Sequence, residues 1–150
     1  MKKIFVITMI CILVAGFAYA AADKGTTQEA KAMVGKAVAF YNANGQAKAF
    51  QAFNDSKGKF VDRDLYIYVM DMNGKVLSHG TNPKLIGKEL LELKDADGKP
   101  FVKEIIASVK AKGNGWSDYK WTNPVSKKIE AKTAYFQKTA DVIIVCGAYK

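Results

Sequence analysis

The sequence predicts an α+β fold in which helices gather on one side of an antiparallel sheet of about five strands. Apolar residues recur at three- and four-residue spacing between residues 30 and 53, and from residue 65 onward they form short β-type segments. An Asn-Gly pair joins two of these segments, as in a tight hairpin. The chain has 150 residues, 49% of them apolar, which predicts one compact domain and excludes a disordered tail.

The first 20 residues are expected to be a signal peptide, which leaves a mature domain of residues 21–150. Lysines at positions 2 and 3 precede an apolar run over residues 4–17, and Ala-Tyr-Ala at 18–20 is a small-x-small cleavage sequence. Residues 4–22 are just long enough to span a bilayer, so an uncleaved N-terminal membrane anchor is the alternative. Because the cleavage sequence favours removal, we expect a periplasmic or secreted protein.

Two helices are expected next. Thr26-Thr27-Gln28-Glu29 is a capping box, in which the threonine hydroxyl and the glutamate each bind a free backbone N–H at a helix start. The apolar stripe that follows extends to Tyr41 and predicts a helix packed on a core. Residues 42–45 interrupt it, and a shorter helix from Ala47 to Phe53 ends in the turn formers of residues 54–58.

The first two strands are predicted at Leu65–Met70 and Lys75–His79, joined by the turn Asp71-Met72-Asn73-Gly74. A polar loop over residues 80–99 follows. Pro100 then opens a helix, because proline is favoured in the first turn.

This third helix places Phe101, Ile105 and Val109 on one side and stops at Gly113-Asn114-Gly115. Three further strands are expected over residues 116–121, 129–137 and 142–149. The last contains Val-Ile-Ile-Val, which predicts a strand that is covered on both faces.

Short segments along nearly the whole mature chain follow a known order: Ala49-Phe50-Gln51-Ala52-Phe53-Asn54, Gly58-Lys59-Phe60-Val61, Asp64-Leu65-Tyr66, Asp71-x-x-Gly74, His79-x-x-Asn82-Pro83, Ile86-Gly87-Lys88, Lys94-Asp95-x-Asp97-Gly98-Lys99, Gly115-Trp116-x-x-Tyr119-x-Trp121, Asn123-Pro124, Lys132-x-x-Tyr135 and Gly147-x-Tyr149. Together they resemble the single Cache domain family, the PAS-like extracellular sensor domains of chemoreceptors and sensor kinases. The resemblance implies a long N-terminal helix on a PAS-like antiparallel sheet.

The resemblance also implies a function in signal transduction or chemotaxis through capture of a small metabolite, frequently a short carboxylate. Such domains usually precede a transmembrane helix and a signalling output. Because the sequence stops at Lys150, directly after the last strand, we expect a free-standing domain that reports to a separate membrane receptor or kinase. A homodimer through the N-terminal helix is a further expectation.

By position in the family pattern, Lys132 is the expected charge partner of a carboxylate. The resemblance places aromatic residues around the same cavity: Tyr66, Tyr68, His79, Tyr119, Trp121 and Tyr135. Tyr119 and Trp121 are two residues apart and share a strand face, which is also compatible with ordinary core packing. His79 is either a pocket residue or a plain turn residue. Arg63, the single arginine of the chain, precedes the first strand and is expected to be exposed.

Catalysis, a cofactor and a metal site are not expected. Cys146 and His79 could supply a thiol and a base, but Cys146 follows an apolar strand sequence, in which a thiol is normally inert. Asp95-Ala96-Asp97-Gly98 resembles part of a calcium loop, yet its first ligand position falls on Leu93, and Pro100 stands where the loop must keep turning. That segment is therefore predicted to be a turn.

The alternative function is a basic envelope protein that binds anionic polymers through its lysines. The chain carries a net charge of +9, and two of its bases lie in the leader. However, acidic residues are interspersed among the lysines, and there is no run of five bases. This pattern favours a solvated surface, so nucleic acid is not an expected partner.

Overall fold

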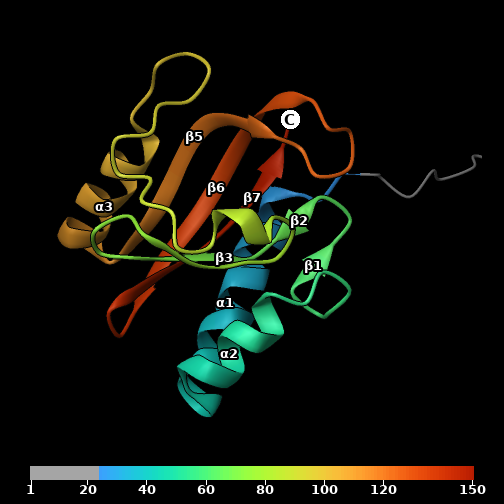
Figure 1. Cartoon of the computed structure of the whole chain (residues 1–150), viewed down its shortest axis with the longest axis vertical. Helices are drawn as coiled ribbons and strands as arrows, with labels where there is room; N and C mark the ends of the chain where they lie inside the picture. Colours follow the sequence, from blue (N-terminus) through green and yellow to red (C-terminus); the bar gives the residue numbers. More distant parts are fainter. Residues whose placement is uncertain (1–23) are drawn as a thin grey trace, which may run out of the picture.

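The computed structural model describes residues 24–150 and has the predicted α+β fold (Figure 1). The expected signal peptide lies outside these residues. The elements are α1 (Thr27–Asn44), α2 (Gln46–Phe53), β1 (Val61–Asp62), β2 (Leu65–Tyr66), β3 (Tyr68–Asp71), β4 (Val76–His79), the 3₁₀ helix η1 (Pro83–Leu85), α3 (Phe101–Lys112), β5 (Asn114–Thr122), β6 (Ile129–Thr139) and β7 (Val142–Tyr149). In the part of the chain described, no helix is long and apolar enough to span a bilayer.

The main sheet has five antiparallel strands, as predicted, and their order is β4-β3-β7-β6-β5. The helix α1 packs on one face, over β6 and β7, whereas α3 packs on the other face, beside β5 (Figure 1). The prediction that the helices gather on one side is therefore wrong, because the apolar stripe of α3 packs in the core opposite α1. Every residue of the central strand β7 is buried, which confirms the prediction of a strand covered on both faces. Alternate residues of β7 therefore belong to two separate cores.

The capping box at the start of α1 is confirmed. The N–H of Glu29 donates to Thr26 Oγ1 over 3.2 Å, and Glu29 Oε2 accepts the N–H of Thr26 over 2.8 Å. Gly45 ends the helix with a φ of 78°, a conformation that glycine adopts without strain. The break between the two predicted helices therefore follows from the glycine.

The predicted strand Leu65–Met70 is wrong in one respect, because it is split at Ile67. Residues 65–66 form β2, which pairs with the short strand β1 in a separate ribbon, and only β3 belongs to the main sheet. Arg63 turns the chain between β1 and β2 with a φ of 57°. Ile67 bonds to Phe60 and Gly80 instead of to a sheet neighbour. The continuous apolar sequence of residues 65–70 does not show that its backbone changes hydrogen-bond partners at Ile67.

The segment between β4 and α3 crosses the sheet on the side of α3 (Figure 1). Its leucines Leu90, Leu91 and Leu93 pack against the core on that side. Asp95 closes the turn as predicted: one carboxylate oxygen accepts the N–H groups of Asp97 and Lys99, and the other accepts that of Lys120. This segment, residues 80–100, thus covers part of the sheet on the side of α3, and we call it the roof segment.

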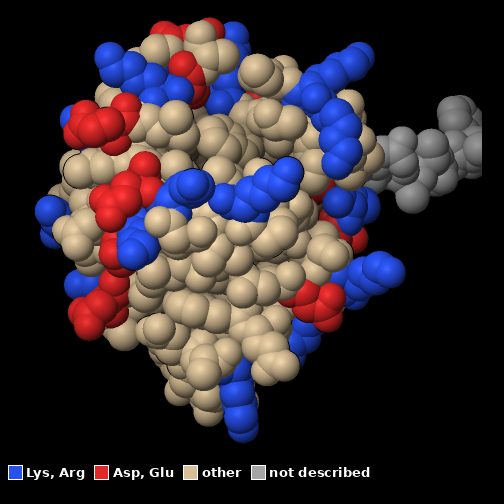
Figure 2. Space-filling view, in the orientation of Figure 1, with Lys and Arg blue, Asp and Glu red and all other residues tan. Residues whose placement is uncertain are grey.

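The charged residues are dispersed on the surface. Figure 2 shows lysines scattered over one face, with acidic side chains among them. Five lysines and Arg63 form ion pairs with acidic residues of the described chain. Arg63 contacts Glu29 and Asp62 at the protein surface, as expected for an exposed turn residue. This distribution fits a solvated surface.

Candidate functional site

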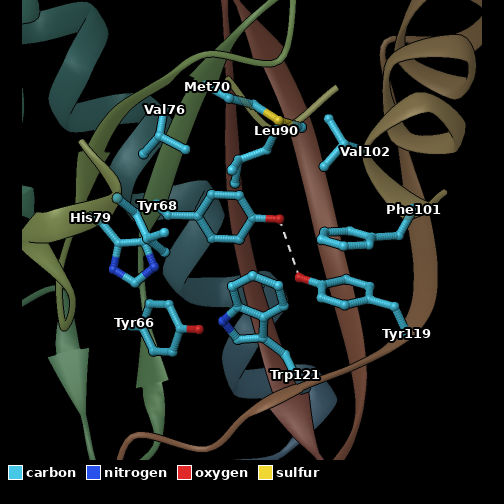
Figure 3. A pocket seen from close by; sticks show the side chains of 11 residues that line it. Tyr66, Tyr68, Met70, Val76, His79, Leu90, Phe101, Val102, Tyr119 and Trp121 are labelled. Atoms are coloured by element: carbon cyan, nitrogen blue, oxygen red, sulfur yellow. Dashed lines mark hydrogen bonds between the residues drawn. The ribbon is translucent and has the colours of Figure 1, made fainter. Parts of the chain in front are cut away.

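A small cavity lies between the sheet, α3 and the roof segment (Figure 3). We call it the inner cavity. Its free space is about 20 Å³, which is room for about one water molecule. Aromatic and aliphatic side chains dominate its lining: Tyr66, Tyr68, Met70, Val76, His79, Leu85, Leu90, Phe101, Val102, Tyr119 and Trp121.

Lys132 extends from β6 into the cluster of tyrosines around this cavity. The residue is only 1% exposed, and its Nζ donates to Tyr66 Oη over 2.9 Å. The ammonium lies 4.2 Å from the ring centre of Tyr66 and 4.9 Å from that of Tyr149. Within residues 24–150, no carboxylate forms an ion pair with it. Burial lowers the pKa of Lys132 to about 8.

Each hydrogen bond of the two tyrosines next to Lys132 has one possible donor. Tyr149 donates its O–H to the carbonyl oxygen of Thr122 over 2.8 Å. The 3.3 Å contact between Tyr66 Oη and Tyr149 Oη then requires that Tyr66 donates and Tyr149 accepts. Tyr66 Oη in turn accepts a hydrogen from Lys132. Neither tyrosine therefore has a proton left for a ligand, whereas the ammonium retains two.

His79 is both a cavity residue and a turn residue. Its Nδ1 accepts the backbone N–H groups of Thr81 and Asn82, over 3.2 and 3.0 Å. The neutral ring must therefore carry its proton on Nε2. Burial, together with the charge of Lys132, lowers the pKa of His79 to about 3. The imidazole thus stays a neutral hydrogen-bond donor near neutral pH.

The far side of the cavity is built on β5. Tyr119 and Trp121 share a face of the strand, as their two-residue spacing predicts. Tyr119 Oη lies 3.2 Å from Tyr68 Oη, which leaves one hydroxyl proton of this pair available (Figure 3). Phe101 of α3 stacks on Tyr119, with ring centres 4.2 Å apart. Helix α3 therefore holds the aromatic wall in place.

A second, more open space adjoins the inner cavity, and we call it the outer groove. Its volume is about 280 Å³. It is lined by Tyr66, His79, Thr81, Asn82, Trp121, Thr122, Asn123, Pro124 and Lys127. Tyr66, His79 and Trp121 line both spaces and so form the partition between them. Movement of one of these side chains would join the groove to the cavity.

Five of the seven residues predicted to form the site line the inner cavity, and a sixth, Lys132, contacts one of them, Tyr66. Tyr135 lies elsewhere, so its expected position was wrong. It belongs to the core on the α1 side, where its ring centre lies 5.0 Å from that of Trp116. Side chains alternate along a strand, and Tyr135 is three residues from Lys132. An odd spacing places the two on opposite faces of β6.

The position of Tyr135 leads to a testable expectation. Tyr135→Phe should leave the affinity for any ligand of the inner cavity unchanged, because the sheet separates its hydroxyl from Lys132. Isothermal titration of the variant and of the unsubstituted protein checks this. A marked loss of affinity would return Tyr135 to the site.

Sequence reasoning missed Tyr149, although it is central to the cluster. Tyr149 pairs directly with Lys132 across β6 and β7. The sequence held a signal in the pattern Gly147-x-Tyr149, in which both residues lie on the face that Lys132 occupies. Identifying that contact requires the register of β6 against β7, which a single sequence does not show.

Gly147 provides the room for the Lys132 side chain. A Cβ atom at this position would lie 2.4 Å from Lys132 Cε and 3.0 Å from the Cβ of Ala134. Gly147→Ala is therefore expected to lower the free energy of unfolding by about 1–3 kcal/mol through overpacking. Chemical denaturation measures this loss.

Gly35 in α1 is the matched control, because a Cβ there meets nothing within 4 Å. Gly35→Ala is expected to stabilise the protein by about 0.5–1 kcal/mol, because alanine loses less backbone entropy in a helix. Equal stability changes in the two variants would show that Lys132 does not need the space at Gly147.

Cys146 has the features of an inert thiol. It is fully buried, and burial raises its pKa to about 12. Its Sγ lies 3.8 Å from the sulfur of Met33 in the core against α1. The thiolate that a nucleophile requires is therefore disfavoured here.

The model of the family described as Single Cache domain 2 matches residues 6–150 of this chain. Among curated proteins, the methyl-accepting chemotaxis protein McpP of Pseudomonas putida is 31% identical over 106 residues. That alignment covers 69% of this chain and 20% of McpP, so the chain spans about a fifth of that relative.

Two solved structures share the fold. A methyl-accepting chemotaxis protein from Vibrio parahaemolyticus superposes with a TM-score of 0.70 at 23% identity, over 81% of this chain and 86% of that one. A second structure, described as the basis for carboxylic acid recognition by a Cache chemosensory domain, has a TM-score of 0.62 at 26% identity. That match covers 81% of this chain and 86% of the other.

Proposed function

Since the chain belongs to the single Cache domain family, we propose that it is a sensor domain that captures a small organic acid beside Lys132. One observation carries this proposal: a buried ammonium contacts Tyr66, which lines the cavity, and no carboxylate of residues 24–150 forms an ion pair with it. A buried charge without a counterion is unfavourable. A bound carboxylate would supply the missing negative charge and accept the two remaining ammonium hydrogens.

The other polar groups around the inner cavity favour the same ligand class. His79 offers Nε2–H, Trp121 offers its indole N–H, and the Tyr68–Tyr119 pair offers one hydroxyl. No acidic side chain lines this cavity among the described residues. An acid without an amino group therefore fits better than an amino acid, whose ammonium would lie close to Lys132.

The size of the inner cavity indicates a short acid. Its free space holds about one water molecule, so capture requires the roof segment or Trp121 to move outward first. Entry through the outer groove would pass the partition of Tyr66, His79 and Trp121. A bound acid would shift the balance between open and closed positions of the roof segment and Trp121, and this shift would be the signal that the sensor transmits.

The comparisons support a sensory role. The chain belongs to the single Cache domain family, a relative with 31% identity is a chemotaxis protein, and one structural neighbour is a Cache chemosensory domain that recognises carboxylic acids. We propose that this domain acts in the periplasm or outside the cell after cleavage of its leader. It would report to a membrane receptor or kinase in signal transduction or chemotaxis, without catalysing a reaction. The homodimer through α1 stays a prediction.

A series of three-carbon compounds tests the proposal: propionate, lactate, pyruvate and alanine, each measured against sodium chloride of equal ionic strength. A ligand at 100 times its dissociation constant stabilises the fold by about 2.7 kcal/mol. We therefore expect at least one of the three acids to raise the unfolding temperature, and alanine to have no effect. If no acid raises it, the site does not capture carboxylates.

The salt dependence of binding separates this function from the alternative of a polyanion-binding surface. Capture in a buried site should keep its affinity between low and moderate salt, because exposed charges are screened far more than buried ones. Binding of a polyanion such as heparin to surface lysines should collapse over the same range. If the affinity for the acid falls with salt as steeply as the affinity for heparin does, the acid binds to surface lysines and not in the buried site.

A further inference from the structure

Three hydrogen bonds connect Lys132 to the loop between β5 and β6. Lys132 donates to Tyr66, Tyr66 donates to Tyr149, and Tyr149 donates to the carbonyl oxygen of Thr122. All the donors point in the same direction, away from the ammonium. Such chains polarise one another, so the charge at one end strengthens each bond that follows. We call this chain the tyrosine relay.

The relay ends at a loop that is held by buried polar contacts. Asn123, which follows Thr122, is 1% exposed, and its side-chain oxygen accepts the N–H groups of Val125 and Ser126. Its Nδ2 donates to Asp64 Oδ2 over 3.3 Å and to Glu130 Oε2 over 3.2 Å. The loop of residues 123–128 therefore depends on one asparagine that contacts two carboxylates.

The same two carboxylates hold the first described residues of the chain. Asp64, which is fully buried, accepts the N–H of Gly25 at Oδ1 over 2.7 Å. Glu130 accepts a hydrogen of Lys24 Nζ over 2.8 Å, and Lys24 also donates to the carbonyl oxygen of Lys150. The start of the described chain, its C-terminal residue and the β5–β6 loop thus share one polar cluster.

We propose that the tyrosine relay couples occupancy of the inner cavity to the β5–β6 loop and to residues 24–25, with Tyr149 as its positioning residue. The inference rests on the proposed function for its ligand, but the relay itself is present without one. When a carboxylate pairs with the ammonium of Lys132 through its two remaining hydrogens, it neutralises the charge that polarises Tyr66. The bonds from Tyr66 to Tyr149 and from Tyr149 to Thr122 then weaken, and the loop loosens.

Amide hydrogen exchange of the full chain, followed residue by residue by NMR, tests the coupling. The probe is sodium propionate against sodium chloride of equal ionic strength. We expect propionate to accelerate exchange of the amides of Gly25, Asn123 and residues 125–128 by about two- to tenfold, the factor that one net hydrogen bond contributes. Amides of α3 serve as the internal reference. Binding of propionate without this acceleration overturns the proposal.

Tyr149→Phe breaks the relay without removing a donor from the ligand. We expect this variant to bind propionate, to show faster exchange in the loop when empty, and to show no further change with propionate. Tyr41→Phe is the matched control, because its hydroxyl contacts Gln46 on the outside of α1 and α2. A full propionate response in Tyr149→Phe would contradict the relay.

Lys132→Met tests the relay without any ligand. It removes the charge that polarises the chain, so it should loosen Gly25 and residues 123–128 in the empty protein, relative to α3. Unchanged exchange in this variant contradicts the relay whether or not acids bind. Conversely, a loosened loop in a protein that binds no acid would refute the proposed function and leave the relay standing.

Discussion

Lys132→Met should reduce the affinity for propionate at least about 30-fold, because removing one member of a buried charge pair costs about 2–5 kcal/mol. Methionine keeps a flexible stem of similar shape against Gly147 but carries no charge and no donor hydrogen. Isothermal titration measures the loss. Lys138→Met, at an exposed position of the same strand, is the matched control and should bind as the unsubstituted protein does.

The same variant should fold at least as well as the unsubstituted protein. In the empty site, the ammonium of Lys132 is buried and forms no ion pair within residues 24–150, although the charge of Asp64 favours its protonated form. Replacement of such a buried charge by an apolar group is often neutral or stabilising. An equal or higher unfolding temperature, together with lost binding, assigns the effect to recognition. Unchanged affinity in Lys132→Met would remove this residue from the site.

The second large effect is a loss of affinity at alkaline pH. Burial lowers the pKa of Lys132 to about 8 in the empty protein, whereas a bound carboxylate favours the charged form and raises this pKa. Above pH 8, binding must therefore take up one proton. The affinity should fall about tenfold for each further pH unit, until the pKa of the occupied site is reached.

Titration calorimetry in two buffers of different ionisation enthalpy counts the proton directly. Between pH 6 and 7, where propionate is ionised, the affinity should be constant, because His79, with a pKa of about 3, stays neutral there. An affinity that is flat from pH 7 to 10 would contradict a titrating Lys132.

Stability should show the opposite trend with pH. The folded pKa of Lys132, about 8, lies below its ordinary value of 10.5, so between these values the unfolded chain binds more protons. The contribution of Lys132 to the free energy of unfolding therefore rises with pH over this window. The difference between the unsubstituted protein and Lys132→Met isolates this contribution from that of Cys146, whose raised pKa acts in the reverse sense.

The elements could be predicted where local chemistry determines them. The capping box at Thr26, the glycine at position 45 and the uniformly apolar β7 each act within a few residues, and the structure confirms all three. The break at Ile67 could not be predicted, because it depends on which distant backbone groups that residue bonds. The periodicity of apolar residues indicates which side chains are buried, but it does not identify the backbone hydrogen-bond partners of a strand.

The candidate site could be predicted only in part. The family pattern grouped Lys132 with Tyr66, and the structure brings the two into contact; the two-residue spacing of Tyr119 and Trp121 placed both on one face. The same spacing rule, applied to Tyr135, would have excluded it. Tyr149 required the strand register, and the contribution of Leu90 required the path of the roof segment across the sheet.

The buried thiol of Cys146 makes this protein easy to convert into a fluorescent reporter. It is the one cysteine within residues 24–150, and the core shields it from maleimide reagents. In the mature domain of residues 21–150 expected from the sequence, which lacks Cys11, a Lys127→Cys variant at this exposed position on the rim of the outer groove would then take up a dye selectively. The emission of that dye would report the rearrangement of the loop in real time.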